Sequence, residues 1–153
     1  MIADTRGKLE LTVPVAKPYG ATWSDCAVSL HGNWWETMRV ALESAYGRTP
    51  FFEYYADDFL PLIASPQRFT SIADLCCDFD KAIRRALTVT TPVYYQPAPS
   101  CSPIPEMAIP PYYQVRERQL GFIPDLSILD LIFNLGPEAL LLLASVKAVS
   151  TLA

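Results

Sequence analysis

The sequence of 153 residues has few charged side chains and no excess of basic ones. Charged residues make up 18% of the chain, apolar residues 51%, and the formal net charge at pH 7 is -4. Proteins that bind nucleic acids neutralise phosphates with a basic surface, so this balance argues against a nucleic-acid partner. With so little charge to cover the surface, we expect a partner or a further segment to cover part of the apolar area.

Glycine loops, cysteine pairs and metal-ligand clusters are also missing. The six glycines are scattered, and neither a dinucleotide-binding nor a phosphate-binding loop pattern occurs. The cysteines have no CxxC spacing, and we interpret them as buried free thiols; they are Cys26, Cys76, Cys77 and Cys101. We therefore predict no bound metal and no tightly held cofactor.

No segment has the pattern of a signal peptide or a membrane span. Residues 1–6 include the polar Asp4, Thr5 and Arg6 and lack the apolar core of a signal peptide. The longest apolar run, 139–149, is interrupted by Ser145 and Lys147 and is shorter than the roughly 20 residues of a spanning helix. The sequence thus predicts no membrane span and a cytoplasmic location.

Strand periodicity occurs in three places. Polar and apolar residues alternate over 8–15, and Pro14 puts this strand at a sheet edge or ends it. A second short strand is expected over 26–30, before a turn that contains His31. The β-branched run 88–94 predicts a third.

Helical periodicity predicts three helices in the first half of the chain. Apolar residues form one stripe over 34–46. Thr49 and Pro50 are expected to begin a second helix, which Pro61 ends. A capping box at 71–74 begins a third, which runs to about Leu87.

The C-terminal third begins with a proline-rich segment. Residues 92–111 contain seven prolines, which predicts an extended crossover. Ser127 is placed to cap a further helix. Residues 136–138 are expected to end that helix and to begin a last, apolar helix. Leu140–Leu143 is apolar on every side and must be covered by the domain or by a second subunit. The whole predicts a mixed α/β fold: one domain over 1–153, with a small sheet packed by four or five helices.

Three residues are candidates for a general acid or base. His31 is the sole histidine, and Asp57 and Asp130 lie on predicted helices. Each has a plainer explanation: His31 as a solvated turn residue, Asp57 as a solvated carboxylate, and Asp130 as part of a helix cap. Asp58 points about 100° away from Asp57 on a helix, so these two carboxylates do not form a dyad.

Two groups of side chains are candidates for ligand binding. Asp130 and Asn134 share a helix face and form a polar cluster within an apolar segment. This cluster is either a structural latch or a ligand site. Aromatic and amide side chains that could bind a ligand also fit core packing; they are Trp34, Tyr54, Tyr55, Tyr112, Tyr113 and Gln114.

Several of these runs resemble the WbqC-like family, found among surface-polysaccharide (O-antigen) genes. They are LTVPV at 11–15, SAY at 44–46, PFFEYYADDF at 50–59, PYYQ at 111–114 and IPDLSILDLIFNLGPEA at 123–139. The resemblance implies a role in surface-polysaccharide biosynthesis. It also implies a glycine-transferring activity that attaches an aminoacyl group to a sugar or nucleotide-sugar ligand.

Two departures from the family pattern support a second hypothesis. Members carry an apolar strand and a basic stretch before the LTVPV strand, and we expect this chain to lack that segment. Met38 stands where many members have a histidine. The alternative is a truncated, non-catalytic member that acts as a binding or structural partner subunit. In either case the apolar C-terminal helix predicts a homo-oligomer.

Overall fold

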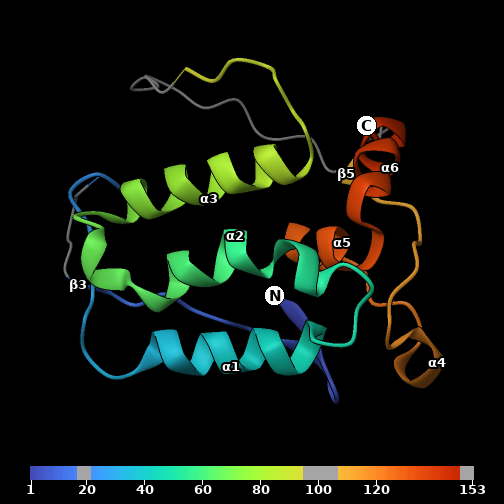
Figure 1. Cartoon of the computed structure of the whole chain (residues 1–153), viewed down its shortest axis with the longest axis horizontal. Coiled ribbons are helices and arrows are strands. Elements are labelled where there is room, and N and C mark those ends of the chain that lie inside the picture. The colour runs from blue at the N-terminus through green and yellow to red at the C-terminus, as the bar shows by residue number, and fades with distance from the viewer. Residues whose placement is uncertain (17–21, 95–106, 149–153) are drawn as a thin grey trace, which may run out of the picture.

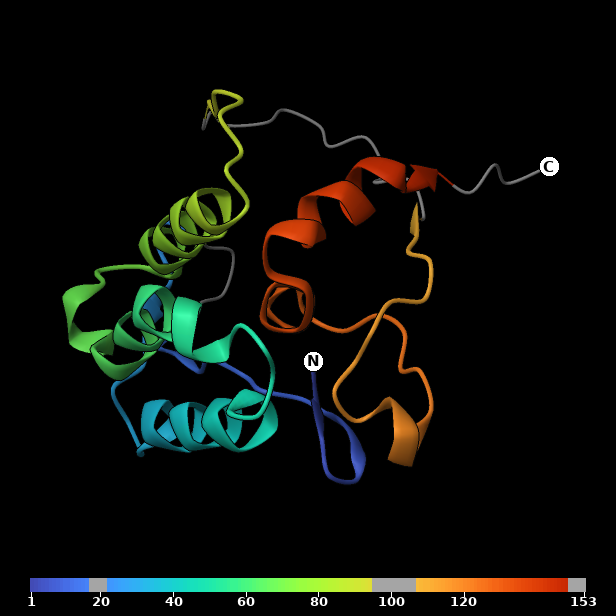
Figure 2. The same ribbon diagram turned by 45° about the vertical axis from the view of Figure 1, so that its right-hand side comes forward.

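The structure is a computed structural model of the chain, and it describes residues 1–16, 22–94 and 107–148. Three long helices, α1 (Trp34–Tyr46), α2 (Phe52–Ala64) and α3 (Ile72–Ala86), lie side by side with α2 in the middle (Figure 1). Figure 2 shows the C-terminal elements on one side of this row. The mixed helix and strand composition agrees with the predicted fold class.

The strands are short and pair antiparallel in separate two-stranded ladders. The N-terminal ladder joins β1 (Ile2–Asp4) to β2 (Gly7–Leu9). The second joins β3 (Val15–Ala16) to β4 (Ala27–Val28). The predicted strand over 8–15 is therefore divided between two ladders, and the one over 26–30 is shortened to β4. The third ladder joins β5 (Met107–Ala108) to β6 (Lys147–Ala148).

The strand predicted over 88–94 was wrong, since the structure describes these residues and none of them is in a strand. The backbone N–H groups of Thr88 and Val89 donate to carbonyls of the last turn of α3. Thr88 has a positive φ of 54°, which turns the chain at the helix end. Pro92 follows shortly after. Residues 88–94 thus follow directly on the end of α3, and no described strand pairs with them.

The predicted boundaries of α2 also need correction. Thr49 donates its hydroxyl to the carbonyl of Tyr46, so it closes α1 instead of capping α2. Pro61 lies inside α2 and does not end it. Pro61 is exposed while Leu62 and Ile63 beyond it are buried. Burial of these two side chains favours another helical turn, and water can reach the carbonyl that the proline leaves unpaired.

The beginning of α3 follows the predicted capping box. Ser71 accepts from the Asp74 N–H, and the Asp74 carboxylate accepts from the Ser71 N–H. The buried-thiol prediction holds for Cys26 but was wrong for Cys76, which is exposed on α3. Leu75 takes the buried position beside it, and successive helical residues point about 100° apart. Cys101 lies outside the described residues.

The core is centred on the phenylalanine of helix α5 (Ile128–Leu135). The Phe133 ring is fully buried and lies 5.2 Å from Tyr46, 5.1 Å from Phe52 and 5.9 Å from Phe59, measured between ring centres. Tyr46 comes from α1 and the two phenylalanines from α2, so α5 anchors the C-terminal part to the helical row. Ser127 caps α5 by accepting from the Leu129 N–H, as predicted.

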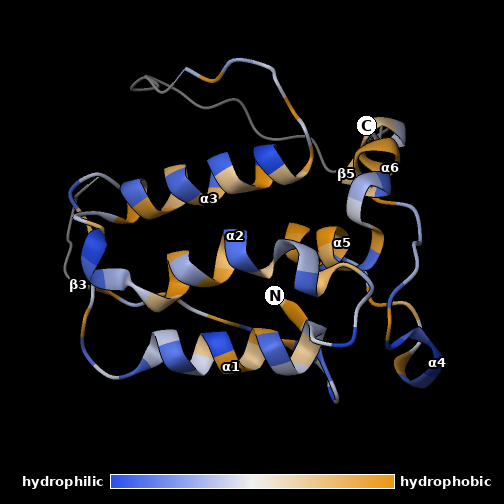
Figure 3. Ribbon diagram, viewed as in Figure 1, coloured by the Kyte–Doolittle hydropathy of each residue, from blue (hydrophilic) through white to orange (hydrophobic). Residues whose placement is uncertain are grey.

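The chain turns sharply between α5 and α6 (Ala139–Ser145). The turn is a short 3-10 helix, η2 (Gly136–Glu138), at the predicted break. Figure 3 shows α6 as hydrophobic over most of its length, and Leu141 is 72% exposed. The two remaining short helices are η1 (Pro66–Arg68) and α4 (Glu117–Leu120).

The stretch from Ile128 to Ser145 is long and apolar enough to cross a membrane by length and composition. Of this stretch, 39% is buried inside the fold. The core helix of a soluble protein passes the same test, and α5 packs in the core. Length and composition are therefore only a weak indication of a span.

Candidate functional site

A buried carboxylate on α5 lies at the centre of the candidate site. Asp130 is only 1% exposed. The hydroxyl of Tyr112 donates to its Oδ2 atom at 2.6 Å, and the amide of Gln114 approaches the same atom at 3.4 Å. A buried carboxylate requires such donors to offset the loss of water. The structure therefore brings together three of the residues that the sequence singled out.

The amide side chains beside Asp130 are occupied by backbone groups. Gln114 donates to the carbonyl of Ile123 at 2.8 Å and accepts from the N–H of the same residue at 2.9 Å. Asn134 donates to the carbonyl of Asp130 at 2.8 Å and accepts from the N–H of Val115 at 2.9 Å. These bonds tie segment 112–115 to α5 and to residue 123. These contacts favour the latch interpretation for Gln114 and Asn134, while Tyr112 and Asp130 are joined side chain to side chain.

The sequence indicates no functional role for Tyr46, which joins this cluster from the end of α1. Its hydroxyl accepts from the N–H of Ala3 at 3.4 Å and hydrogen-bonds the Asp130 carboxylate. Its place on the buried stripe of a helix could have indicated this contact, because the hydroxyl of a buried tyrosine needs a hydrogen-bond partner. Arg116 completes this region, because its Nη2 donates to the Ser44 carbonyl at the C-terminal end of α1.

Burial sets the acid-base behaviour of the cluster. Loss of water raises the pKa of Asp130, against the opposing effect of hydrogen bonds from Tyr112, Tyr46 and Gln114. Burial also raises the pKa of Tyr112 and of Tyr46, and the nearby carboxylate raises both further. The two tyrosines therefore stay protonated donors. An ionised Asp130 is a stronger base than an exposed aspartate.

A small cavity of about 140 Å³ lies beside Tyr112, and we call it the Tyr112 cavity. The Tyr112 ring meets Phe122 edge-to-face with ring centres 5.4 Å apart. Tyr112 thus belongs both to the cavity wall and to the Asp130 cluster. The other lining residues are Ile109, Pro124, Asp125, Leu126, Ser127, Ile128 and Leu131. The volume suits one small group rather than a whole nucleotide.

A comparison of the sequence with protein families identifies a relative for the first two thirds of the chain. The profile of the WbqC-like protein family matches residues 1–101. The chain belongs to the WbqC-like protein family. The matched part includes the LTVPV run at 11–15 and the aromatic block at 50–59. It ends before Tyr112 and Asp130, so the case for a site there rests on the geometry of the cluster.

No curated protein matches this WbqC-like chain, and no solved structure does. Among the described residues, no group of three or more His, Cys, Asp or Glu side chains is placed to hold a metal ion.

Other predicted catalytic residues of this WbqC-like chain lie apart from the cluster. His31 is exposed and precedes the first residue of α1, whereas Tyr46 is the last. The 13 residues of α1 span about 20 Å. His31 and Asp130 therefore do not act on the same bond. Asp57 is exposed on α2.

The predicted aromatic residues are likewise divided. Tyr54 is 76% exposed on α2 and meets the buried Tyr55 edge-to-face, 4.7 Å between ring centres. Trp34 donates its indole N–H to the carbonyl of Ser29, and this bond gives the tryptophan a structural role. Tyr113 is exposed beside Tyr112. Of the aromatic candidates, Tyr112 is the one that the structure brings to Asp130.

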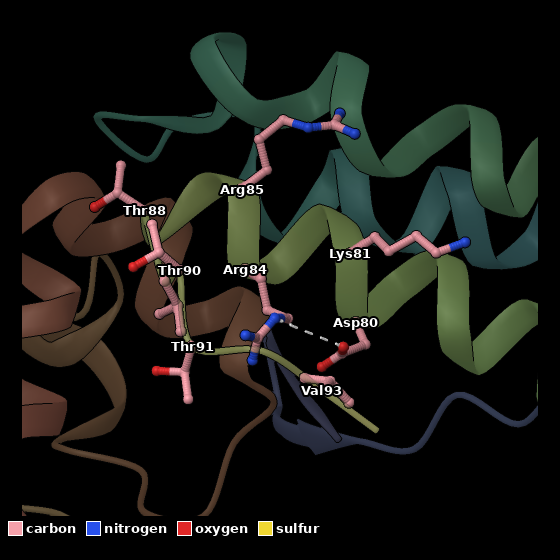
Figure 4. Close-up of a pocket in the computed structure, with 9 residues that line it drawn as sticks. Asp80, Lys81, Arg84, Arg85, Thr88, Thr90, Thr91 and Val93 are labelled. Atoms are coloured by element: carbon pink, nitrogen blue, oxygen red, sulfur yellow. Dashed lines mark ion pairs between the residues drawn. The ribbon is translucent and has the colours of Figure 1, made fainter. Parts of the chain in front are cut away.

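A larger cleft of about 690 Å³ lies along the end of α3, and its basic side chains suggest an anion site at first sight (Figure 4). Figure 4 shows Lys81 and Arg85 extending away from the segment that carries Thr90 and Thr91. The C-terminal end of a helix is also unfavourable for an anion. Each cation has a carboxylate partner; the pairs are Lys81–Asp78 at 2.9 Å, Arg85–Asp58 at 3.1 Å and Arg84–Asp80 at 3.9 Å.

Proposed function

We propose that this WbqC-like protein acts in surface-polysaccharide biosynthesis in the cytoplasm and binds the sugar part of a sugar or nucleotide-sugar ligand at the Tyr112 cavity. The observation that carries the proposal is the hydrogen bond of 2.6 Å between Tyr112 and Asp130. It connects a cavity with aromatic walls to a buried carboxylate. Aromatic faces beside hydrogen-bonding groups suit the apolar faces and hydroxyls of a sugar ring.

The reaction that we propose is transfer of a glycyl group from an activated ester or thioester donor to a sugar hydroxyl. The sugar oxygen forms a bond to the acyl carbon, the bond from that carbon to the donor breaks, and the donor leaves as an alcohol or thiol after it takes up the proton that the sugar hydroxyl releases. The proton of the sugar hydroxyl passes to the Tyr112 oxygen while Tyr112 gives its own proton to Asp130. The raised pKa of Asp130 supports this role as the final base.

The test of ligand binding is thermal protection by sugar nucleotides. A ligand that binds the folded chain raises its melting temperature. We expect a rise for the unchanged chain and for Tyr54→Phe, which alters an exposed tyrosine of α2, and a smaller rise for Tyr112→Phe. Tyr112→Phe keeps the ring but removes the hydroxyl that contacts Asp130. The proposal fails if no sugar nucleotide protects the chain, or if Tyr112→Phe is protected equally.

One observation favours a second function, that of a partner subunit. Leu140 and Leu141 on α6 are 36% and 72% exposed, side by side on a helix without charged residues. An exposed apolar patch of this kind is typical of a protein interface. In this alternative the chain contributes binding surface to a homo-oligomer and performs no chemistry.

A further inference from the structure

The Tyr112 cavity has an unusual balance of charge. Among the described residues that line it, Asp125 is the only ionisable residue other than Tyr112, and none is a lysine, arginine or histidine. A phosphate placed there would meet the Asp125 carboxylate, and the nearby Lys8 ammonium is already paired with that carboxylate. Phosphate sites use arginine, lysine or helix N–H groups, and here the Ser127 side chain already caps α5. The charge of the walls therefore argues against a phosphate and for a positive group.

The walls contain the groups that recognise an ammonium ion. The rings of Tyr112 and Phe122 offer aromatic surface, and Asp125 offers a counter-ion. Cations are attracted to aromatic faces, and sites for organic ammonium ions use this attraction. Lys8 on β2 shows that the Asp125 carboxylate is accessible to an ammonium group, because its Nζ atom lies 3.8 Å from Asp125 Oδ2. A chain ammonium thus already pairs with the carboxylate at the rim of this cavity.

This lysine pair is weak enough for a ligand to replace it. The side chain of Asp125 is 82% exposed and that of Lys8 is 35% exposed. Exposed ion pairs contribute little, since water screens them and both side chains lose freedom. A ligand ammonium that also contacts the rings of Tyr112 and Phe122 would therefore pair with Asp125 more favourably than Lys8 does.

We propose that the Tyr112 cavity selects a small organic ammonium group, from an aminoacyl compound or an amino sugar, with Asp125 as its counter-ion. This inference rests on the proposed function, because it concerns the same cavity and names the group that enters it. The phosphates of a nucleotide-linked ligand then lie outside the cavity. Asp125 is a binding residue in this proposal, whereas Asp130 remains the buried base.

The experiment compares matched charged and neutral ligands by calorimetric titration of the full chain. Glucosamine is compared with glucose, and glycinamide with acetamide, at slightly acidic pH where both amines are protonated. We expect the ammonium compound of at least one pair to bind more tightly than its neutral partner. The pair that shows the preference identifies the source, amino sugar or aminoacyl group.

Three variants locate the effect. Asp125→Asn should reduce the preference for the ammonium compound by about twofold to fivefold, the range of an exposed ion pair. Lys8→Gln should increase ammonium affinity, because it removes the competing side chain. Glu53→Gln makes the same charge change at an exposed site on α2 and should leave the preference intact.

The possible failures are distinguishable. If the neutral compound binds as tightly as its amine in both pairs, or if the preference survives Asp125→Asn unchanged, the ammonium inference is overturned while sugar binding stands. If none of the four compounds binds, the ammonium inference is overturned, and protection by sugar nucleotides separately decides the proposed function. Unchanged affinity in Lys8→Gln contradicts the role of Asp125 as counter-ion.

Discussion

At the scale of single residues, the buried side chains of Gln114 and Asp130 differ in their hydrogen-bond partners. The Gln114 amide bonds both backbone groups of Ile123, so its donor and acceptor positions are fixed by structure. Asp130 accepts from side chains, and one of these, Tyr112, also reaches a cavity wall. Substitutions at Gln114 should therefore affect stability, and those at Tyr112 should affect binding as well.

Gln114→Glu should destabilise the fold strongly. The change removes the donor to the Ile123 carbonyl and places a second carboxylate within reach of Asp130. A buried carbonyl without a partner costs about 1–3 kcal/mol, and repulsion between the carboxylates adds to this. Urea unfolding measures the loss. Gln119→Glu on the exposed face of α4 is the matched control, and an equal effect at both positions would contradict the latch.

The stability contributed by Asp130 should fall as pH rises. Burial raises its pKa in the folded state, so the folded chain holds this proton more tightly than the unfolded chain. The contribution is full below the ordinary carboxyl pKa of about 3.9 and is lost as pH rises through the folded value. The measurement compares the melting temperatures of the unchanged chain and of Asp130→Asn as the pH is raised from below the ordinary carboxyl pKa. The difference between the two chains gives the contribution of Asp130. A difference that grows with pH would show the opposite shift.

At the scale of elements, the turn between α5 and α6 depends on one glycine. Gly136 has φ of 55°, and a Cβ added there would lie 2.6 Å from the Phe51 ring. Phe51 also donates its N–H to the carbonyl of Phe133, so this contact joins α2 to α5. The position therefore combines a backbone requirement with a steric one.

Gly136→Ala should cost more stability than the same change at another glycine with positive φ. Gly32 has φ of 73° and nothing within 4 Å of an added Cβ, so Gly32→Ala isolates the backbone cost. Overpacking against Phe51 adds about 1–3 kcal/mol in Gly136→Ala. Unfolding free energies of the two variants give the difference directly. Equal values would mean that the Phe51 ring moves aside without cost.

Sequence patterns predicted elements well where local chemistry decides them. The apolar stripe over 34–46 and the capping box at 71–74 gave α1 and the beginning of α3. They misjudged Pro61 and residues 88–94, where burial of following residues and the absence of a neighbouring strand decide the outcome. Such effects depend on tertiary contacts that a local pattern does not contain.

At the scale of the whole molecule, the cluster joins segments that lie far apart in the sequence. The sequence placed Asp130 and Asn134 on one helix face, which their spacing dictates. It did not bring Tyr46 to them, because that contact depends on how α1 packs against α5 and β1. The spacing within one helix was predictable, and the packing between helices was not.

The exposed leucines of α6 predict self-association. If α6 is a subunit interface, light scattering should give a mass above 17.0 kDa for the unchanged chain, and Leu141→Gln should return it to the monomer. Val40→Gln is the matched control, since Val40 is 50% exposed on α1. A monomeric unchanged chain would remove the support for the partner-subunit function.

The central claim is that the Tyr112 cavity holds the sugar part of the ligand. Amide chemical shifts of the isotope-labelled chain, followed by NMR during titration with a sugar nucleotide, test this most directly. We predict that the largest shifts occur at Phe122, Asp125 and Ile128, whose residues line the cavity. An absence of shifts, or shifts concentrated in the cleft along residues 80–93, would contradict the claim.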